Sequence, residues 1–212
     1  MQTYRICKGM DPADADIAMV EHYFAKGSDH RPRTIVQVCH DRSVIHARFA
    51  VEDRFVRAVS KGYHHRIWCD SCVEFFIQPL PDRGYFNFEF SANEQFLVSY
   101  ITDPERVPGG FKAFVKIPWE LAKEVRVKSS LGGGLIEPEI KEQVSWTLEA
   151  AIPVALLEHY VGPLHPLSGQ IWRGNFYKCG DETSHPHWGA WSPVKNEVSF
   201  HQPAYFGELP LA

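Results

Sequence analysis

The sequence is short of the features that mark several large classes of protein. Five cysteines in 212 residues are an odd and sparse set, which argues against a disulfide-stapled scaffold and favours a reducing compartment. Lys and Arg number 22 against 26 Asp and Glu and form no basic stripe, so nucleic acid is a poor candidate partner. No run approaches the roughly 18 apolar residues of a membrane-spanning helix, and we expect no membrane partner.

Common enzyme signatures are missing as well. The chain contains no G-x-S-x-G, P-loop or G-x-G-x-x-G pattern, so neither a hydrolase elbow nor a nucleotide-binding loop is indicated. Residues 1–10 lack the apolar core of a secretory leader. This predicts a cytoplasmic location for the chain as given, or an extracellular one if a leader has been removed. The sequence leaves the oligomeric state open.

What the chain does contain is a series of short segments in which apolar and polar residues alternate. Fifteen Gly and fifteen Pro residues suit a fold with many turns. Nine predicted strands with little helix indicate one all-β domain over residues 1–212, a two-sheet antiparallel β-sandwich of the jelly-roll or immunoglobulin-like kind. The predicted strands are Thr34–His40, Val44–Glu52, Cys72–Gln78, Gly84–Ser91, Gln95–Ile101, Phe111–Pro118, Val144–Ile152, Ile171–Cys179 and Tyr205–Leu209.

Three segments do not follow the strand pattern. Asp11 and Pro12 form a helix start, and apolar residues then recur at helical spacing up to Gly27, which predicts an N-terminal helix. Pro153–Tyr160 predicts a second short helix with Pro in its first turn. Lys128–Lys141, which contains three consecutive glycines, predicts a long mobile loop.

The alternation in the fourth predicted strand separates a core face from a polar face. Phe86, Phe88 and Phe90 point one way, and Asn87 and Glu89 point the other, because successive side chains leave a strand on opposite faces. We expect the three phenylalanines in the core. The polar pair is left for solvent or for a ligand.

Glu74 is a charge in an otherwise apolar strand and therefore needs a partner or a purpose. With Glu89 it could form the carboxylate pair of a glycosidase, which requires two carboxyl groups about 5–10 Å apart. Carboxylates that only accept hydrogen bonds from sugar hydroxyls would have the same sequence. Both interpretations stay open at this point.

The cysteines and histidines allow two further interpretations. Cys69 and Cys72 have the spacing of a thioredoxin-type motif, but Cys72 leads into a strand instead of starting a helix, which disfavours redox activity. Zinc ligands of the right type occur without the spacing of a standard zinc knuckle, so ordinary thiols and loop histidines are favoured. The candidate ligands are Cys69, Cys72, Cys179, His185, His187 and His201.

Five of the six tryptophans fall into two groups, and Trp119, which follows Pro118 at the end of a predicted strand, fits either. Trp146 and Trp172 lie in predicted strands with apolar partners, and we place them in the core. Trp68, Trp188 and Trp191 lie in polar segments rich in Pro, Gly, Ser and His. A pyranose ring offers a face of C–H groups that stacks on an indole, with polar partners around its hydroxyls. These three tryptophans with the nearby acidic and amide residues therefore predict a sugar site.

Several of these segments, taken in order, are similar to those of a known family. The chain resembles the family 9 carbohydrate-binding module, within a broader group of sandwiches that includes the DOMON domains. The resemblance implies a non-catalytic β-sandwich that binds a mono- or oligosaccharide. It rests on residues 67–77, 85–90, 172–177, 188–193 and 200–207.

The resemblance also implies roles for individual residues. Sugar binders of this family clamp a terminal sugar between two tryptophans, at the positions of Trp68 and Trp191 here, and Glu74 matches a hydrogen-bonding Glu. Glu89 stands where such binders carry Arg, and Trp188 stands where they carry Asn. Some members hold structural calcium, whose ligands have no assigned positions in this chain.

The expected ligand-binding set follows from the residues and the resemblance together. Two alternatives are a glycoside-active enzyme that uses Glu74 and Glu89, and a DOMON-type haem-binding domain with axial His or Met ligands. The three methionines all precede the predicted sandwich, which disfavours the haem. The expected sugar-binding residues are Trp68, Glu74, Asn87, Glu89, Trp188 and Trp191.

Overall fold

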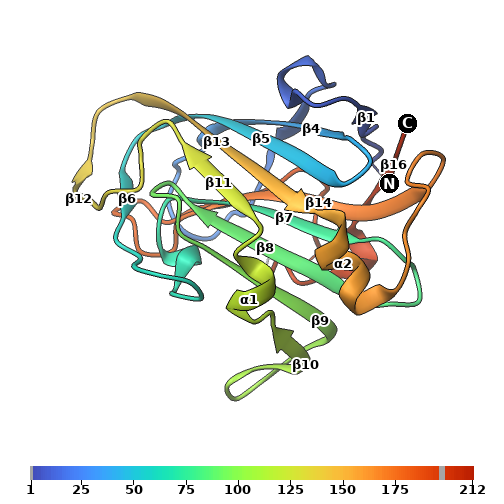
Figure 1. Ribbon diagram of the computed structural model, residues 1–212. Coiled ribbons are helices and arrows are strands. Elements are labelled where there is room, and N and C mark those ends of the chain that lie inside the picture. Colours follow the sequence, from blue (N-terminus) through green and yellow to red (C-terminus); the bar gives the residue numbers. More distant parts are fainter. Residues whose placement is uncertain (1, 196–198) are drawn as a thin grey trace.

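Two β-sheets stacked face to face make up most of the structure (Figure 1). The computed structural model describes residues 2–195 and 199–212. Within these residues the first sheet has six strands in the order β1-β4-β5-β13-β11, with β2 also paired to β4, and all pairs except β1 with β4 are antiparallel. Its strands are β1 (Cys7–Lys8), β2 (Ala18–Val20), β4 (Arg33–His40), β5 (Val44–Asp53), β11 (Arg126–Ser129) and β13 (Val144–Pro153).

The second sheet has eight strands in the described residues, in the order β10-β9-β8-β7-β14-β15-β3, with β16 also paired to β14. Together the two sheets confirm the predicted antiparallel sandwich. The strands of the second sheet are β3 (His22–Tyr23), β7 (Cys72–Gln78), β8 (Tyr85–Ser91), β9 (Phe96–Val107), β10 (Gly110–Lys116), β14 (Ile171–Cys179), β15 (Trp188–Ala190) and β16 (Gly207–Pro210).

Short elements complete the fold. A separate two-stranded sheet joins β6 (Val56–Ala58) to β12 (Ile136–Ile140). None of the helices in residues 2–195 and 199–212 is long and apolar enough to span a bilayer. The helical segments are η1 (Pro12–Asp14), η2 (Ile67–Cys69), α1 (Trp119–Ala122), α2 (Val154–Val161) and η3 (Pro203–Tyr205).

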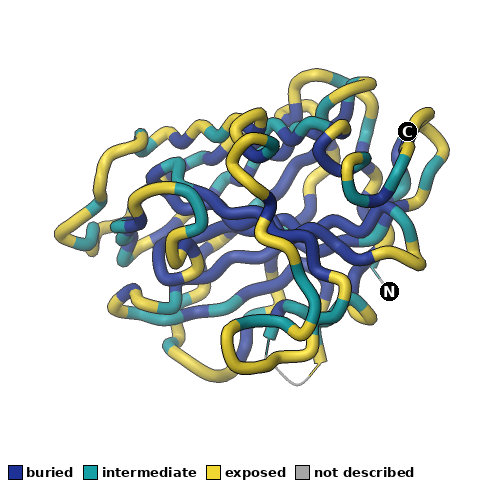
Figure 2. The backbone as a smooth tube through the Cα atoms, turned by 60° about the horizontal axis from the view of Figure 1, so that its bottom comes forward, coloured by how far each residue is buried: buried dark blue, intermediate teal, exposed yellow. Residues whose placement is uncertain are grey.

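The main core lies between the two sheets. Phe86, Phe88 and Phe90 on β8 are fully buried there, as the alternation predicts, and so are Trp146 and Trp172. Figure 2 shows the central strands as buried and the connecting loops as mostly exposed. Burying one large apolar side chain contributes about 1.5–3 kcal/mol, so this aromatic layer is a major source of stability.

The outer face of the eight-stranded sheet is also covered, although its strands carry polar residues there. Tyr85, Asn87 and Glu89 alternate with the three core phenylalanines and still have exposed fractions of 5% or less. A second apolar cluster and the loops that contribute to it cover this face. Its buried members are Phe24, Ile67, Cys72, Phe76, Tyr85, Leu97, Ile101, Tyr177, Cys179, Ala190, Phe200 and Phe206.

The predicted N-terminal helix is wrong beyond its first turn. The Asp11 side chain does accept a hydrogen bond from the backbone N–H of Ala13, but the helix η1 ends at Asp14. The carbonyls of Ala13 and Ala15 accept hydrogen bonds from the Gln37 amide on β4 instead of from later helical N–H groups. The chain then enters β2, which pairs with β4.

The segment Lys128–Lys141 is not the irregular loop that its glycines predict. It begins in the last residues of β11 and includes β12, whose Ile136 and Ile140 pair with β6 and pack against the core. The predicted helix Pro153–Tyr160 is confirmed as α2, with Pro153 at its N-cap.

Candidate functional site

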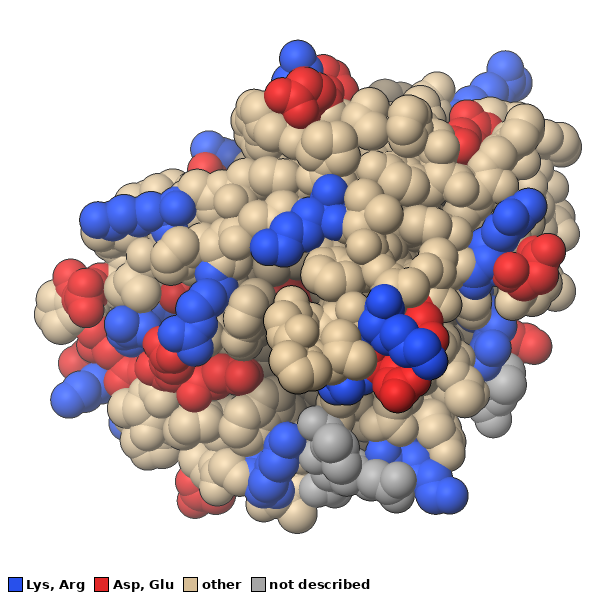
Figure 3. All heavy atoms as spheres, turned by 90° about the horizontal axis from the view of Figure 1, so that it is seen from below, with Lys and Arg blue, Asp and Glu red and all other residues tan. Residues whose placement is uncertain are grey.

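A pocket of about 430 Å³ lies on the outer face of the eight-stranded sheet. Its floor is made by side chains of β7, β8, β9 and β14, and its walls by the β9–β10 turn, the β14–β15 connection and the segment before η3. Seen from below, this face carries Lys and Arg side chains around a hollow (Figure 3). The volume lies within the range of small-ligand sites, roughly 300–1,000 Å³.

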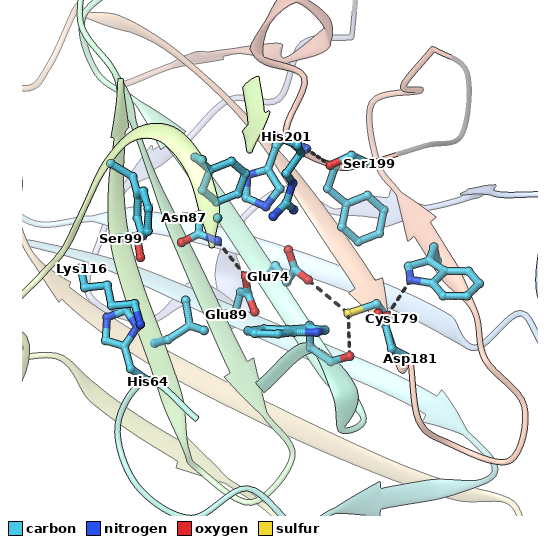
Figure 4. Close-up of a pocket in the computed structure, with 18 of the residues that line it drawn as sticks. His64, Glu74, Asn87, Glu89, Ser99, Lys116, Cys179, Asp181, Ser199 and His201 are labelled. Atoms are coloured by element: carbon cyan, nitrogen blue, oxygen red, sulfur yellow. Dashed lines mark hydrogen bonds between the residues drawn. The ribbon is translucent and has the colours of Figure 1, made fainter. Parts of the chain in front are cut away.

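Glu74, Asn87 and Glu89 form the polar centre of the floor (Figure 4). Glu74 on β7 lies directly opposite Glu89 on β8 in the strand register. Asn87 comes two residues before Glu89 and shares its face, and its Nδ2 donates to Glu89 Oε1 at 2.7 Å. Exposed fractions of 3%, 3% and 5% place all three in a nearly water-free environment. The structure therefore brings together the three polar residues predicted from the sequence.

Burial changes the protonation of this carboxyl pair. Loss of water raises the pKa of Glu89 to about 8, although the Asn87 hydrogen bond acts to lower it. Burial, and then the neighbouring charge of Glu89, raise the pKa of Glu74 well above its usual value. Two carboxylates facing each other across neighbouring strands repel, and a low-dielectric surrounding strengthens that repulsion. Burial therefore favours the protonated form of both carboxyl groups.

Two oxygen atoms of the floor have no partner in the described residues. Asn87 Oδ1 and Glu89 Oε2 are buried and accept no hydrogen bond. No Lys, Arg or His nitrogen in the described ranges lies within 4.0 Å of a Glu74 or Glu89 oxygen. Arg106 of strand β9, a cation of the pocket wall, lies over the Phe111 ring at 4.0 Å instead. Buried polar atoms without a protein partner are uncommon and call for a partner from water or from a ligand.

Two tryptophans form part of the pocket wall, and one aspartate connects them. Trp68 is 37% exposed, and its carbonyl accepts a hydrogen bond from the Asp181 backbone N–H at 3.0 Å. The Asp181 carboxylate accepts a second hydrogen bond, from Trp188 Nε1 at 2.7 Å. Lys26 lies over the Trp188 ring at 4.9 Å, so Trp68 offers the freer indole face.

Trp191 does not line this pocket. It is 6% exposed and belongs to the core between the sheets, where its ring packs against Tyr4 and Phe176. A side chain at Gly207 would meet the Trp191 ring at 2.5 Å, so the ring fills its space completely. Trp188 begins β15 and Trp191 directly follows it, and the odd separation of three residues in extended chain puts the two side chains on opposite faces. The expected pairing of Trp68 with Trp191 is therefore corrected: the structure brings Trp188 to Trp68's pocket.

Asp70 and Ser71, which directly precede β7, hold the backbone of neighbouring segments in place. Asp70 is fully buried and accepts hydrogen bonds from the backbone N–H groups of Val59 and Ser60 and from the Ser91 hydroxyl. The neighbouring Ser71 hydroxyl accepts from the Arg57 backbone. These contacts fasten the segment after β6 to the start of β7, and so they hold Trp68 at the pocket.

The cysteines beside the pocket, Cys69, Cys72 and Cys179, are buried. Cys72 on β7 lies directly opposite Cys179 on β14, and Cys179 Sγ donates to Glu74 Oε1 at 3.1 Å. Burial raises the pKa of Cys72 to about 12, and burial likewise raises the pKa of Cys69 to about 12. An activated redox thiol has a lowered pKa, so the raised pKa values of Cys69 and Cys72 disfavour a redox role, as their sequence context does.

The six candidate zinc ligands do not converge on one point. His185 stacks on Phe55, His187 bonds Lys178, and His201 bonds Tyr85. His187 is buried, not a surface loop residue. Among the described residues, one group of three possible ligand atoms lies within 4.8 Å of one another. That group is Cys72, Glu74 and Cys179.

Calcium does not fit this group of ligands. Calcium takes six to eight oxygen ligands, whereas two thiols suit zinc or a softer ion. The calcium expected for some family members therefore has no support at this cluster.

Sequence reasoning missed several pocket residues. Asp181, Arg106 and His201 each line the pocket but lie in loops or at a strand end whose partners are distant in sequence. A hairpin pairing of Cys179 with Trp188 brings Asp181 beside the indole. That pairing could have been predicted only if the short strand β15 had been recognised.

The fold and the sequence both match known proteins. The model of carbohydrate-binding family 9 matches residues 6–211. A candidate carbohydrate-binding protein from Bacteroides uniformis is 29% identical, with coverage of 100% of this chain and 99% of that chain and a TM-score of 0.88. No curated protein sequence matches the chain.

More distant solved structures share the fold. A family 9 carbohydrate-binding module from Caldicellulosiruptor kristjanssonii, solved in complex with cellotriose, is 13% identical with a TM-score of 0.61, covering 99% of this chain and 93% of that chain. The module in complex with glucose gives the same identity and TM-score, covering 100% of this chain and 96% of that chain. Because the family model spans nearly the whole chain, the protein belongs to carbohydrate-binding family 9.

Proposed function

We propose that the pocket on the outer face of the eight-stranded sheet binds the end of a carbohydrate without chemical conversion. In this proposal a sugar ring stacks on Trp68, with Trp188 as a second apolar wall, and its hydroxyls bond Glu74, Asn87 and Glu89. The observation that carries the proposal is the combination of a partly exposed indole with unpartnered buried acceptors in one pocket. A sugar needs both, because it has an apolar face and a polar rim.

Family membership and the solved relatives support the class of ligand. The Caldicellulosiruptor kristjanssonii module was solved with cellotriose, a sugar of three units, and with glucose, a single unit. A pocket of about 430 Å³ has room for one or a few units. We therefore infer that the ligand is a mono- or oligosaccharide bound by its terminal ring.

Isothermal titration tests this proposal. Wild-type protein is titrated with common hexoses and with cello- and xylo-oligosaccharides, and we expect saturable heat with at least one of them. Trp68→Ala should weaken that binding roughly tenfold or more, about 1.4 kcal/mol. Trp119→Ala is the matched control, because Trp119 is 50% exposed and does not line the pocket. An affinity unchanged by Trp68→Ala would contradict the proposal.

Glycoside hydrolysis is a second candidate, favoured by one observation. Glu74 and Glu89 lie opposite each other and have raised pKa values, as a general acid requires. Turnover of aryl-glycosides that Glu74→Gln abolishes would support this candidate, and no turnover with any of them would exclude it in favour of binding alone.

The wider relationship to DOMON domains stays a prediction from the sequence. The alternative that the chain binds haem depends on this relationship. Absorbance spectra recorded after haem addition test it, since a bound haem with axial protein ligands gives a characteristic band.

A further inference from the structure

The buried acids of this protein fall into two kinds according to their partners. Asp53 is 1% exposed, and its carboxylate lies 3.4 Å from Lys178 Nζ and 2.8 Å from His30 Nε2. Glu74 and Glu89 are equally buried and have no cationic partner within 4.0 Å in the described ranges. A buried acid is normally paired. The missing partner of the pocket acids is therefore expected from outside the chain.

The free atoms of the floor specify which chemical group would complete it. Asn87 Oδ1 and Glu89 Oε2 are both acceptors without donors, and Glu74 adds a second carboxyl group beside them. An ammonium group has three donors and no acceptor, and it neutralises a carboxylate. A neutral hydroxyl brings one donor and no charge, so it cannot form an ion pair with either acid.

The other charged and titratable groups of the pocket do not pair with the floor acids. Lys26 and Lys116 line the pocket, but among the described residues neither ammonium lies within 4.0 Å of a Glu74 or Glu89 oxygen. Asp181 adds a third acid to the pocket. His201 is held neutral, because burial lowers its pKa well below the usual value. Cys179 donates to Glu74, and Arg106 is stacked on the Phe111 ring.

A metal ion is a weaker candidate for the same position. Among the described residues, the group of possible metal ligands that contains Glu74 consists of Glu74, Cys72 and Cys179 and does not include Glu89. A metal ion held there would therefore leave Glu89 without a partner. The exposed face of Trp68 at the pocket favours an organic cation as well, because indole rings attract cations in addition to stacking on sugar rings.

We infer that the pocket prefers a sugar that carries a free amino group, with its ammonium placed against Glu74, Glu89 and Asn87. This inference rests on the proposed function and names the class of sugar within it. Either the sugar arrives as an ammonium and pairs with an ionised glutamate, or a neutral amine takes the proton of a protonated glutamate. Both routes end in the same ammonium–carboxylate pair.

The experiment compares sugars that differ only at one substituent. Wild-type protein at neutral pH is titrated calorimetrically with glucose, with amino-hexoses that carry the amine at different ring carbons, and with their N-acetyl derivatives. We expect at least one free amino-hexose to bind roughly tenfold more tightly than its parent hexose. Acetylation removes the charge, so it should remove this preference.

Variants assign the preference to the floor. Glu89→Gln and Glu74→Gln keep the side-chain shape and remove the charge, and each should bring the ratio of amino-hexose to hexose affinity to within about twofold of one. Glu182→Gln is the matched control, because Glu182 pairs with Arg66 at the surface and does not line the pocket. It should leave the ratio unchanged. Thermal unfolding of each variant verifies its fold, and the wild-type ratio alone decides the inference if a variant does not fold.

The outcomes separate this inference from the proposed function. If hexoses bind and every amino-hexose binds equally or more weakly, the inference is overturned while carbohydrate binding stands. If no hexose, amino-hexose or oligosaccharide binds, the proposed function fails and the inference fails with it.

Discussion

The two sides of the eight-stranded sheet treat buried charge in opposite ways. Between the sheets, burial alone would raise the pKa of Asp53, but the Lys178 ammonium and the His30 hydrogen bond lower it to about 2. On the outer face, burial raises the pKa of Glu89 to about 8, because a single amide is its hydrogen-bond partner. Similar burial thus goes with a lowered pKa for Asp53 and a raised pKa for Glu89, because Asp53 has a cationic partner beside it. The inner acid has its ion-pair partners within the fold, whereas Glu89 of the outer pair keeps one oxygen without a partner among the described residues.

The largest effect should come from breaking the inner pair. Lys178→Met leaves the Asp53 carboxylate buried without its ammonium, and we expect a loss of about 3–5 kcal/mol in the free energy of unfolding. Urea unfolding measures it. Arg33→Met is the control, since its partner Glu52 is half exposed and such pairs contribute about 0–1 kcal/mol. A similar small loss in both variants would contradict the comparison.

The same pair predicts an acid limit of stability. The folded-state pKa of Asp53, about 2, lies below its usual 3.8. Its contribution is therefore present above about 3.8 and is lost as the pH falls toward 2. The Lys178→Met variant should lose this part of the acid transition.

A comparison of tryptophans sharpens the contrast between the two faces. Trp191→Ala removes a ring packed among Tyr4, Phe176 and Gly207, and we expect a loss of about 3–5 kcal/mol in the free energy of unfolding. Trp68→Ala removes a partly exposed ring and should cost less than half as much. Chemical denaturation of both variants measures the difference. Equal losses would place Trp68 in the core.

The outer acids should show the reverse pH dependence. The pKa of Glu89 rises from 4.5 to about 8 on folding, so the folded state binds more protons in this range. Its contribution is fully present below about 4.5 and is lost as the pH rises toward 8. Glu89→Gln should remove this slope and gain on the order of a few kcal/mol at the alkaline end. Unfolding measured at several pH values, with Glu182→Gln as control, checks the sign.

The smallest effect concerns the thiols of the outer face. The raised pKa of Cys72, about 12, leaves almost no thiolate at neutral pH, and burial blocks access. We expect native protein to be alkylated by iodoacetamide far more slowly at this residue than unfolded protein. Peptide mass spectrometry after timed alkylation measures the rate. Fast native labelling of Cys72 would show that the floor opens.

Long alternating segments could be located from the sequence because their period is repeated several times. The predicted strands Cys72–Gln78 and Ile171–Cys179 agree with β7 and β14. The helix predicted for residues 11–27 was wrong because the apolar residues there fit both a helix and a strand. Pairing of β2 with β4 selected the strand. In Lys128–Lys141 the glycines and Pro138 indicate a loop, so β12 was not predicted. It forms a strand because it pairs with β6.

The candidate site was predicted in part for the same reason. Glu74, Asn87 and Glu89 share a face of long strands, so their position on the outer face follows from parity alone. Trp188 and Trp191 lie at β15, which has three residues and is too short to reveal its register. Without the pairing of β15 with β14, the sequence could not predict that Trp188 lines the pocket and Trp191 lies in the core.

By itself the sequence determined that this chain forms an aromatic-rich β-sandwich and which residues of its long strands point away from the core, because alternation is a local property. The tertiary structure alone decided which tryptophan reaches the pocket, and that Asp53 has a cationic partner while Glu89 has none within 4.0 Å in the part of the chain that the structure describes. Those outcomes depend on contacts between residues distant in the chain, and the pKa of a buried acid is set by such contacts.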